Sequence, residues 1–177
     1  MFMQFFINLV PNKAIFTQTF FVLALLLSVS ACKEEKIQMY DPAKQAADDE
    51  LLIKEWIAKD STMRQAKRTD SGIYYATQKA GTGAQVKLGN TVKVHYIGRY
   101  LNGSKFDSSY DSGNAFELTI GQTAVIQGWT EGLQLMQEGE TTRFYIPSGL
   151  AYGPYGKKPI PANTVLVFDI NVLKIVN

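Results

Sequence analysis

Residues 124–133 read AVIQGWTEGL, and the rest of the 177-residue chain is expected to fold around this stretch. An apolar pair leads into Gly128, and apolar residues then recur at helical spacing through Trp129, Leu133 and Met136. This spacing predicts a short helix with one face on the protein core. A Trp at the start of such a helix either packs as ordinary core or forms the floor of a cavity, and its surroundings decide which.

Strand patterns lie on both sides of this helix. The β-favouring segments are residues 73–77, 91–100, 116–120, 141–147 and 164–176. Asn102-Gly103 is a strong hairpin-turn signal. About five strands and one core helix predict an α+β fold, in which a curved antiparallel sheet with one buried face wraps over the helix.

A second helix is predicted before the sheet. Asp41-Pro42 has the residue types of an N-cap followed by a first helical position, and good helix formers continue to Lys59. The expected apolar face consists of Leu52, Ile53, Trp56 and Ile57, and the expected solvated face of Asp48, Asp49, Glu50, Lys54, Glu55 and Lys59. Such a helix needs a partner, either the following domain or a second copy of the chain. Residues 61–71 are expected to be a polar connector.

The N-terminus has the pattern of a secretory signal. Lys13 precedes an uncharged, largely apolar run at residues 14–31, which ends in small residues before Cys32. Residues 29–32, VSAC, resemble the lipobox of bacterial lipoproteins, in which the Cys becomes the acylated first residue. An uncleaved membrane anchor is the alternative. The predicted organisation is a lipoprotein-type signal at 1–31, a tether and amphipathic helix at 32–71, and one domain at 72–177.

Composition and residue inventory exclude several function classes. The net charge of +2 and the scattered Lys and Arg residues give no basic stripe, so nucleic-acid binding is not expected. The chain has one histidine, His95, which is expected to face solvent, and one cysteine, so neither a zinc site nor a Cys/His pair can be built. Asp107 and Asp111 lie among Ser and Gly residues, where turn formation explains them. No metal, cofactor or catalytic nucleophile is therefore expected.

Five motifs in order resemble the FK506-binding-protein (FKBP) family of peptidyl-prolyl isomerases. They are VHYIG at 94–98, GSKFDSS at 103–109, VIQGW at 125–129, AYG at 151–153 and LVFDI at 166–170. The resemblance covers about residues 72–176. It implies an FKBP-like antiparallel half-barrel sheet wrapped around one short helix, here with an N-terminal helical extension.

The resemblance also implies a pocket. The residues expected to act in catalysis are Tyr96, Phe106, Asp107, Ile126, Trp129, Tyr152 and Phe168, and those expected to bind substrate are Phe116, Val125 and Ile160. Trp129 would form the floor under a proline ring, while the Ile126 backbone N–H and the Tyr152 hydroxyl would hold substrate carbonyls.

The sequence departs from the family pattern at three places. Leu118 replaces a frequent Phe, and Ser112 falls near a position that often holds an Arg paired with the pocket Asp. The loop at residues 154–159 is shortened, which affects substrate choice around Tyr155 and Lys157.

The implied activity is peptidyl-prolyl cis-trans isomerisation on exported, proline-containing polypeptides, with no cofactor and with FK506-like macrolides as inhibitors. A lipid-anchored proline-binding or chaperone module with incidental isomerase activity, in a surface or motility assembly, is the alternative. A structural lipoprotein that dimerises through the helix at 41–59 is a further one. The expected location is the cell envelope, with the lipid on Cys32 in a bacterial membrane, most simply the periplasmic or surface face of the outer membrane.

Replacement of the cysteine tests the anchor. Cys32→Ala is expected to remove a lipid mass increment from the mature chain and to release the protein from membranes, because no other acylation site follows the small residues. Mass spectrometry and membrane fractionation measure both effects. An Ala variant that stays membrane-bound at high salt would contradict the lipid anchor and favour the uncleaved helix.

Overall fold

Helices and strands in the computed structural model follow one another along residues 39–176, which are the residues the structure describes. The signal at 1–31, Cys32 and the first part of the tether lie outside the described residues. The elements are α2 (Pro42–Lys59), η1 (Ser61–Met63), β1 (Lys67–Arg68), β2 (Tyr74–Lys79), β3 (Thr91–Tyr100), β4 (Lys105–Ser108), β5 (Phe116–Thr119), α3 (Gln127–Gln134), β6 (Thr141–Ile146), η2 (Ser148–Leu150), η3 (Gly153–Tyr155) and β7 (Leu166–Ile175).

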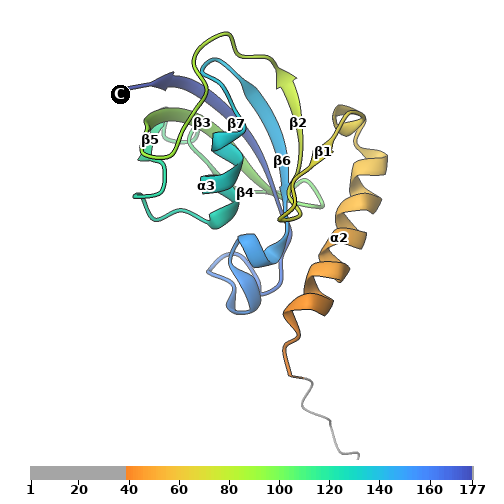
Figure 1. The fold of residues 1–177 in the computed structure, drawn as a ribbon. Helices are drawn as coiled ribbons and strands as arrows, with labels where there is room; N and C mark the ends of the chain where they lie inside the picture. Colours follow the sequence, from red (N-terminus) through yellow and green to blue (C-terminus); the bar gives the residue numbers. More distant parts are fainter. Residues whose placement is uncertain (1–38, 177) are drawn as a thin grey trace, which may run out of the picture. The chain divides into compact units, whose positions relative to one another are not determined.

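The strands form one antiparallel sheet with the order β1-β2-β6-β7-β3-β4, and β5 pairs with another part of β3. Figure 1 shows the sheet curving around α3, so the α+β prediction of a sheet wrapped over one core helix is confirmed. Two strands were missed: β4, which completes the hairpin at Asn102-Gly103, and β1, a two-residue strand within the segment expected to be a connector. Both are too short to show a period-2 pattern.

Helix α3 lies against the inner face of the sheet. Trp129 and Leu133 of α3 are 4% and 0% exposed, and both belong to the main hydrophobic cluster. Strands β6 and β7 contribute Phe144 and Phe168 to the same cluster. The apolar residues that predicted this helix therefore point at the sheet.

Helix α2 starts as the sequence predicts. The Asp41 carboxylate accepts hydrogen bonds from the backbone N–H groups of Ala43 at 2.9 Å and Lys44 at 3.1 Å, and Pro42 is the first helical residue. These bonds satisfy donors that the first turn of a helix leaves unpaired.

The inner side of α2 packs on the outer face of the sheet, so the partner that this helix needs is its own domain (Figure 1). Ile53 is 0% exposed and belongs to a second hydrophobic cluster with Met63, Tyr145 and Val167. Val165 and Val167 belong to the same cluster and are buried, because α2 covers this face of the sheet. The sheet is thus covered on both sides here.

Two residues of α2 do not lie where the amphipathic pattern placed them. Leu52 was expected in the apolar face but is 43% exposed, and Asp49 was expected in solvent but is 1% exposed. The stripe that faces the sheet contains Asp49, Ile53 and Ile57, which are spaced by four residues, so Leu52 falls at its edge. A hydrophobic pattern alone could not identify a carboxylate within that stripe.

A charged network ties the end of α2 to the sheet. The Arg143 guanidinium donates to both oxygens of Asp169, at 2.6 and 2.9 Å, and to Asp60 at 3.0 Å. Burial alone would raise the pKa of Asp60, but hydrogen bonds from Thr62, Arg143 and Tyr145 outweigh it and lower the pKa to about 2. Asp60 follows α2 directly and therefore fixes its C-terminal end.

The described residues contain neither a membrane-spanning helix nor a cluster of metal ligands. Between residues 39 and 176, none of the helices has the length and apolar character needed to cross a bilayer. In the same residues, no group of three or more His, Cys, Asp or Glu side chains is arranged to hold a metal ion.

The packing of α2 on the sheet predicts unequal effects of two similar substitutions. Ile53→Ala is expected to lower the free energy of unfolding by about 2–4 kcal/mol, because it opens a cavity in a fully buried site. Leu51→Ala removes a side chain that is 68% exposed and should change that free energy by less than about 0.5 kcal/mol. Urea unfolding measures both. Equally small effects would mean that α2 does not pack on the sheet in solution.

Candidate functional site

One cavity collects most of the residues predicted for the site. It has a volume of about 260 Å³ and opens between the sheet, the start of α3 and the loop after β6. Its lining consists of Tyr96, Phe106, Asp107, Phe116, Ala124, Val125, Ile126, Trp129, Tyr152, Lys157 and Phe168. Pockets that hold whole drug-sized ligands measure about 300–1,000 Å³, so this cavity suits part of a ligand, such as one ring.

Aromatic rings surround Trp129 at nearly perpendicular angles. Its ring lies 5.0 Å from Tyr96 and 5.4 Å from Phe168 between centroids, with interplanar angles of 83° and 85°. Phe116 lies 6.0 Å from Trp129, and Phe106 lies 5.6 Å from Phe168 at 89°. Edge-to-face contacts of this kind are favourable and fix the ring orientations. The cavity therefore has rigid apolar walls.

Gly98 of β3 makes room for two of these walls. A Cβ atom at this position would lie 2.7 Å from Phe106 and 2.9 Å from Phe168. Such distances are shorter than van der Waals contact, so any other residue would push the two rings apart. The Gly at the end of the VHYIG motif is thus required for the packing of Phe106 on Phe168.

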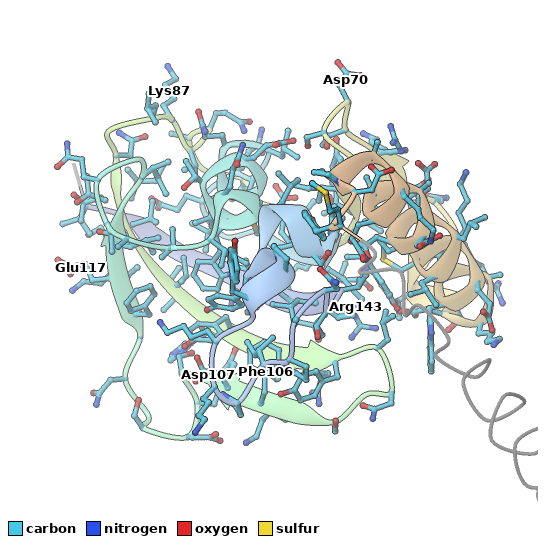
Figure 2. The ribbon with its side chains drawn as sticks, turned by 90° about the horizontal axis from the view of Figure 1, so that it is seen from below. Asp70, Lys87, Phe106, Asp107, Glu117 and Arg143 are labelled. Atoms are coloured by element: carbon cyan, nitrogen blue, oxygen red, sulfur yellow. The ribbon has the colours of Figure 1, made fainter. Side chains whose placement is uncertain are left out.

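Asp107 and Tyr96 form the polar contact on one side of the cavity. The Tyr96 hydroxyl donates a hydrogen bond of 2.7 Å to the Asp107 carboxylate. Burial, followed by this hydrogen bond and the nearby charge, raises the pKa of Tyr96 above its usual value. Figure 2 shows Phe106 and Asp107 on β4 below the loop that follows β6. The residue pattern alone explained Asp107 by a turn, whereas the family resemblance placed it in the pocket; Asp107 lies in strand β4 and lines the cavity.

The Tyr152 hydroxyl donates no hydrogen bond to any described residue. Burial, and secondarily the charge of Asp107, raises the pKa of Tyr152 above its usual value. Ile126 precedes α3 in extended conformation, as the N-cap of the helix. Its backbone N–H makes no hydrogen bond within the described chain. Two donors at the cavity are therefore available to a ligand's carbonyl oxygens.

The indole N–H of Trp129 is also unpaired. It is the one buried side-chain N or O atom in residues 39–176 that has no hydrogen-bond partner. A buried donor left in this state is uncommon in proteins and points to a site rather than plain core. This observation separates the two interpretations of Trp129 that the sequence left open.

The structure brings together every predicted pocket residue except Ile160. Ile160 is 6% exposed and packs in the main cluster, and it does not line the cavity. A tight turn, closed by a 2.9 Å hydrogen bond from Lys157 N–H to the Ile160 carbonyl, leaves Lys157 at the cavity instead. Lys157 and Ala124 were not among the predicted site residues. Lys157 lies 5.7 Å from the Tyr152 ring centroid.

Two of the positions that depart from the family pattern lie away from the cavity walls. Leu118 is 2% exposed and belongs to the core, and the Ser112 hydroxyl donates to the Ser109 carbonyl within the turn before β5. The third departure, the loop at residues 154–159, contributes Lys157 to the cavity lining.

His95 lies on the other side of β3 from Tyr96 and does not line the cavity. It is half-buried rather than facing solvent freely, because its ring stacks on Tyr110 at 4.4 Å and 19°. One of its ring nitrogens is 3.0 Å from the Ser109 hydroxyl. Through these contacts His95 packs against the turn before β5.

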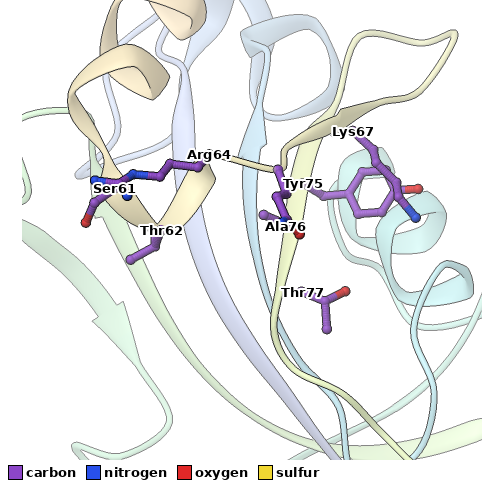
Figure 3. Close-up of a pocket in the computed structure, with 8 residues that line it drawn as sticks. Ser61, Thr62, Arg64, Lys67, Tyr75, Ala76 and Thr77 are labelled. Carbon is purple, nitrogen blue, oxygen red and sulfur yellow. The ribbon is translucent and has the colours of Figure 1, made fainter.

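A second cavity lies at the other edge of the sheet. It has a volume of about 380 Å³. One side is formed by η1 and the segment that follows it, and the other side by strand β2 (Figure 3). Its lining is mainly polar and exposed and includes Arg64 and Lys67. Tyr75 is its one aromatic lining residue, and none of its polar groups is buried without a partner, so the cavity around Trp129 is the better candidate site.

Comparison with known proteins agrees with this geometry. The model of the FKBP-type peptidyl-prolyl cis-trans isomerase family matches residues 83–173. Similar curated relatives are FkpA of Aeromonas hydrophila, 46% identical over 132 residues (75% of this chain and 48% of the relative), and a probable FKBP-type isomerase of Haemophilus influenzae, 40% identical over 153 residues (86% and 59%). The chain spans about half the length of these relatives.

Solved structures of FKBP-type proteins have a similar fold. The crystal structure of FkpA from Escherichia coli has a TM-score of 0.65 at 33% identity and covers 94% of this chain and 73% of that one. The crystal structure of AtFKBP13 has a TM-score of 0.60 at 32% identity and covers 63% and 98%.

The aromatic floor can be tested by replacing each tryptophan in turn. Trp129→Leu should lower the affinity for the macrolide FK506 more than about tenfold, because the ring that closes the cavity is lost, while the chain stays folded. Trp56→Leu, on α2 and outside the cavity, should leave this affinity unchanged within about twofold. Isothermal titration measures affinity, and circular dichroism checks folding. If Trp129→Leu unfolds the chain or leaves affinity intact, Trp129 is plain core.

Proposed function

The chain belongs to the FKBP-type peptidyl-prolyl cis-trans isomerase family, and from this we propose that it catalyses rotation about X–Pro bonds in the aromatic cavity. The observation that carries the proposal is the combination of apolar walls with a few directed donors. Trp129, Tyr96 and Phe168 enclose the space, while the Tyr152 hydroxyl and the Ile126 N–H remain unpaired. These features suit a proline ring with carbonyl groups on either side.

The proposed catalysis follows from the physics of the amide bond. Resonance gives the C–N bond double-bond character and imposes a rotation barrier of about 18–20 kcal/mol. Water that hydrogen-bonds to the carbonyl favours the charge-separated resonance form. A twisted amide has less charge separation, so transfer of the bond from water into an apolar cavity favours the transition state relative to the planar forms.

The residues of the cavity would have distinct roles. Trp129 would support the proline ring, and the surrounding rings would hold its orientation. The Ile126 N–H and the Tyr152 O–H would each donate to a substrate carbonyl and so fix the backbone on either side of the rotating bond. Asp107 would keep the Tyr96 ring in place through the 2.7 Å hydrogen bond. No covalent step is required.

The size of the effect can be bounded. A reduction of the barrier by about 6–8 kcal/mol corresponds to about 10⁴–10⁶-fold acceleration. The cavity offers two contributions to such an effect: desolvation, which favours the less polar twisted amide, and hydrogen bonds to the flanking carbonyls that favour the twisted geometry. The proposed substrates are proline-containing segments of unfolded or partly folded polypeptides, for which isomerisation is a slow folding step.

The proposed location is the cell envelope. The apolar run at 14–31 and the VSAC sequence before residue 33 support export and acylation of Cys32. An isomerase anchored in this way would act on exported chains near the membrane, on the periplasmic or surface face.

The activity is tested with a protease-coupled assay on an Ala-Leu-Pro-Phe peptide. The full chain should accelerate cis-to-trans conversion in proportion to its concentration, and FK506 should abolish the acceleration because both ligands occupy the same cavity. The Trp129→Leu variant is the matched control and should be at least about tenfold less active. A folded protein that binds FK506 but gives no acceleration would support the alternative, a proline-binding module without turnover.

A further inference from the structure

Helix α2 places a buried carboxylate against the loop that carries Tyr152. Asp49 is 1% exposed, although it lies on a helix whose other acidic residues are solvated. Its Oδ2 atom accepts a 2.7 Å hydrogen bond from the backbone N–H of Ser148 and a 2.6 Å bond from the Ser148 hydroxyl. The Gln45 side-chain amide donates to the other oxygen at 2.8 Å. Because three donors bind one carboxylate, the contact between Asp49 and Ser148 is specific.

Ser148 is the first residue of the segment that leads into the cavity. It is 0% exposed and begins η2, whose turn is closed by hydrogen bonds of 3.0 Å from Leu150 N–H to the Pro147 carbonyl and from Ala151 N–H to the Ser148 carbonyl. Tyr152 follows this turn directly and lines the cavity, where the charge of Asp107 acts on its hydroxyl. The segment that carries Tyr152 is thus held at Ser148 on one side, and on the other by a hydrogen bond of 2.8 Å from Asn163 N–H to the Gly153 carbonyl.

Ser148 depends on Asp49 for the hydrogen bonds of its hydroxyl and its backbone N–H. Because this residue has no contact with solvent, loss of Asp49 would leave its N–H and O–H without acceptors, and the segment would have to move to satisfy them. Such a movement shifts Tyr152 before it affects the aromatic walls, which come from β3, β4, β5, β7 and α3.

We propose that Asp49 is a positioning residue for the site: through Ser148 it holds the Tyr152 hydroxyl in the geometry that the reaction uses, and α2 is therefore part of the functional domain. This inference rests on the proposed function, since it assigns a use to the Tyr152 hydroxyl. Asp49 belongs to none of the sequence motifs that line the cavity. It lies on α2, before residue 83, where the match to the family model begins.

A double-mutant cycle in the full chain separates positioning from general stability. Asp49→Asn keeps the shape of the side chain but replaces one acceptor oxygen by a donor, and it should lower kcat/KM for the Ala-Leu-Pro-Phe peptide by about tenfold. In a Tyr152→Phe background the same substitution should change kcat/KM by less than about twofold, because the hydroxyl that Asp49 positions is already absent. All rates are measured at a temperature where circular dichroism shows each variant to be folded.

The neighbouring aspartate provides the matched control. Asp48→Asn alters an exposed residue that pairs only with Lys44, and it should leave kcat/KM within about twofold of the parent. Ser148→Ala removes one of the two donors to Asp49 and should give a smaller fall of the same kind. It also decides the question if Asp49→Asn does not fold.

The outcomes are distinct. Equal losses from Asp49→Asn with and without the Tyr152 hydroxyl would overturn the proposal and leave Asp49 a structural residue, as would full activity in folded Asp49→Asn. If the parent shows no isomerase activity, the proposed function fails. FK506 affinity measured over the same cycle then still tests whether Asp49 acts through Tyr152. A parent that neither turns over peptide nor binds FK506 overturns both proposals.

Discussion

The close approach of α3 to β6 is the contact on which the rest of the site depends. A Cβ atom at Gly128 would lie 2.5 Å from Ile146 Cγ2, so the helix can reach the sheet only because residue 128 has no side chain. This approach sets the depth of the next residue, Trp129, and therefore the height of the cavity floor. The rings of Tyr96 and Phe168 meet the indole edge-on from β3 and β7. A helix displaced outward by even one methyl group would separate these rings and admit water where the proposed chemistry requires its exclusion.

The polar groups of the cavity divide into those that are satisfied and those that are not. The Tyr96 hydroxyl donates its hydrogen bond to the Asp107 carboxylate, so this donor is already used within the protein. The Tyr152 hydroxyl, the Ile126 N–H and the Trp129 N–H have no acceptor in the described chain. Unpaired donors beside an apolar space favour ligands that bring carbonyl oxygens with an apolar ring, because only such ligands satisfy both the donors and the walls. Selectivity among ligands thus arises from the unpaired hydrogen-bond donors of the cavity as well as from its shape.

Sequence patterns were sufficient to predict the core helix, the long strands and α2, and insufficient for the short strands and for the buried carboxylate of α2. The alternation of β3, the helical spacing from Trp129 to Leu133 and the Asp41-Pro42 cap each predicted an element with nearly its observed bounds. Strand β4 was missed because four residues cannot show a period, and Asp107 was consequently assigned to a turn. The pocket residues came from ordered motifs, but the exchange of Ile160 for Lys157 at the cavity depends on a tight loop turn that has no local signature. Asp49 was misplaced for a different reason, since a hydrophobic pattern treats every carboxylate as solvated.

The burial of both faces of the sheet changes how the chain should be divided. Adjacent residues on β6, Phe144 and Tyr145, point into different hydrophobic clusters, one with α3 and the other with α2. A strand that alternates between two cores needs both, because the outer side chains would otherwise be exposed on a flat apolar surface. The match to the family model begins at residue 83, whereas the packed layers begin at Pro42. Once α2 covers the outer face, Asp49 is buried at the level of Ser148, and its carboxylate is stable there only because Ser148 and Gln45 supply donors. The layer that the motifs do not describe is therefore the one that fixes the loop of the site.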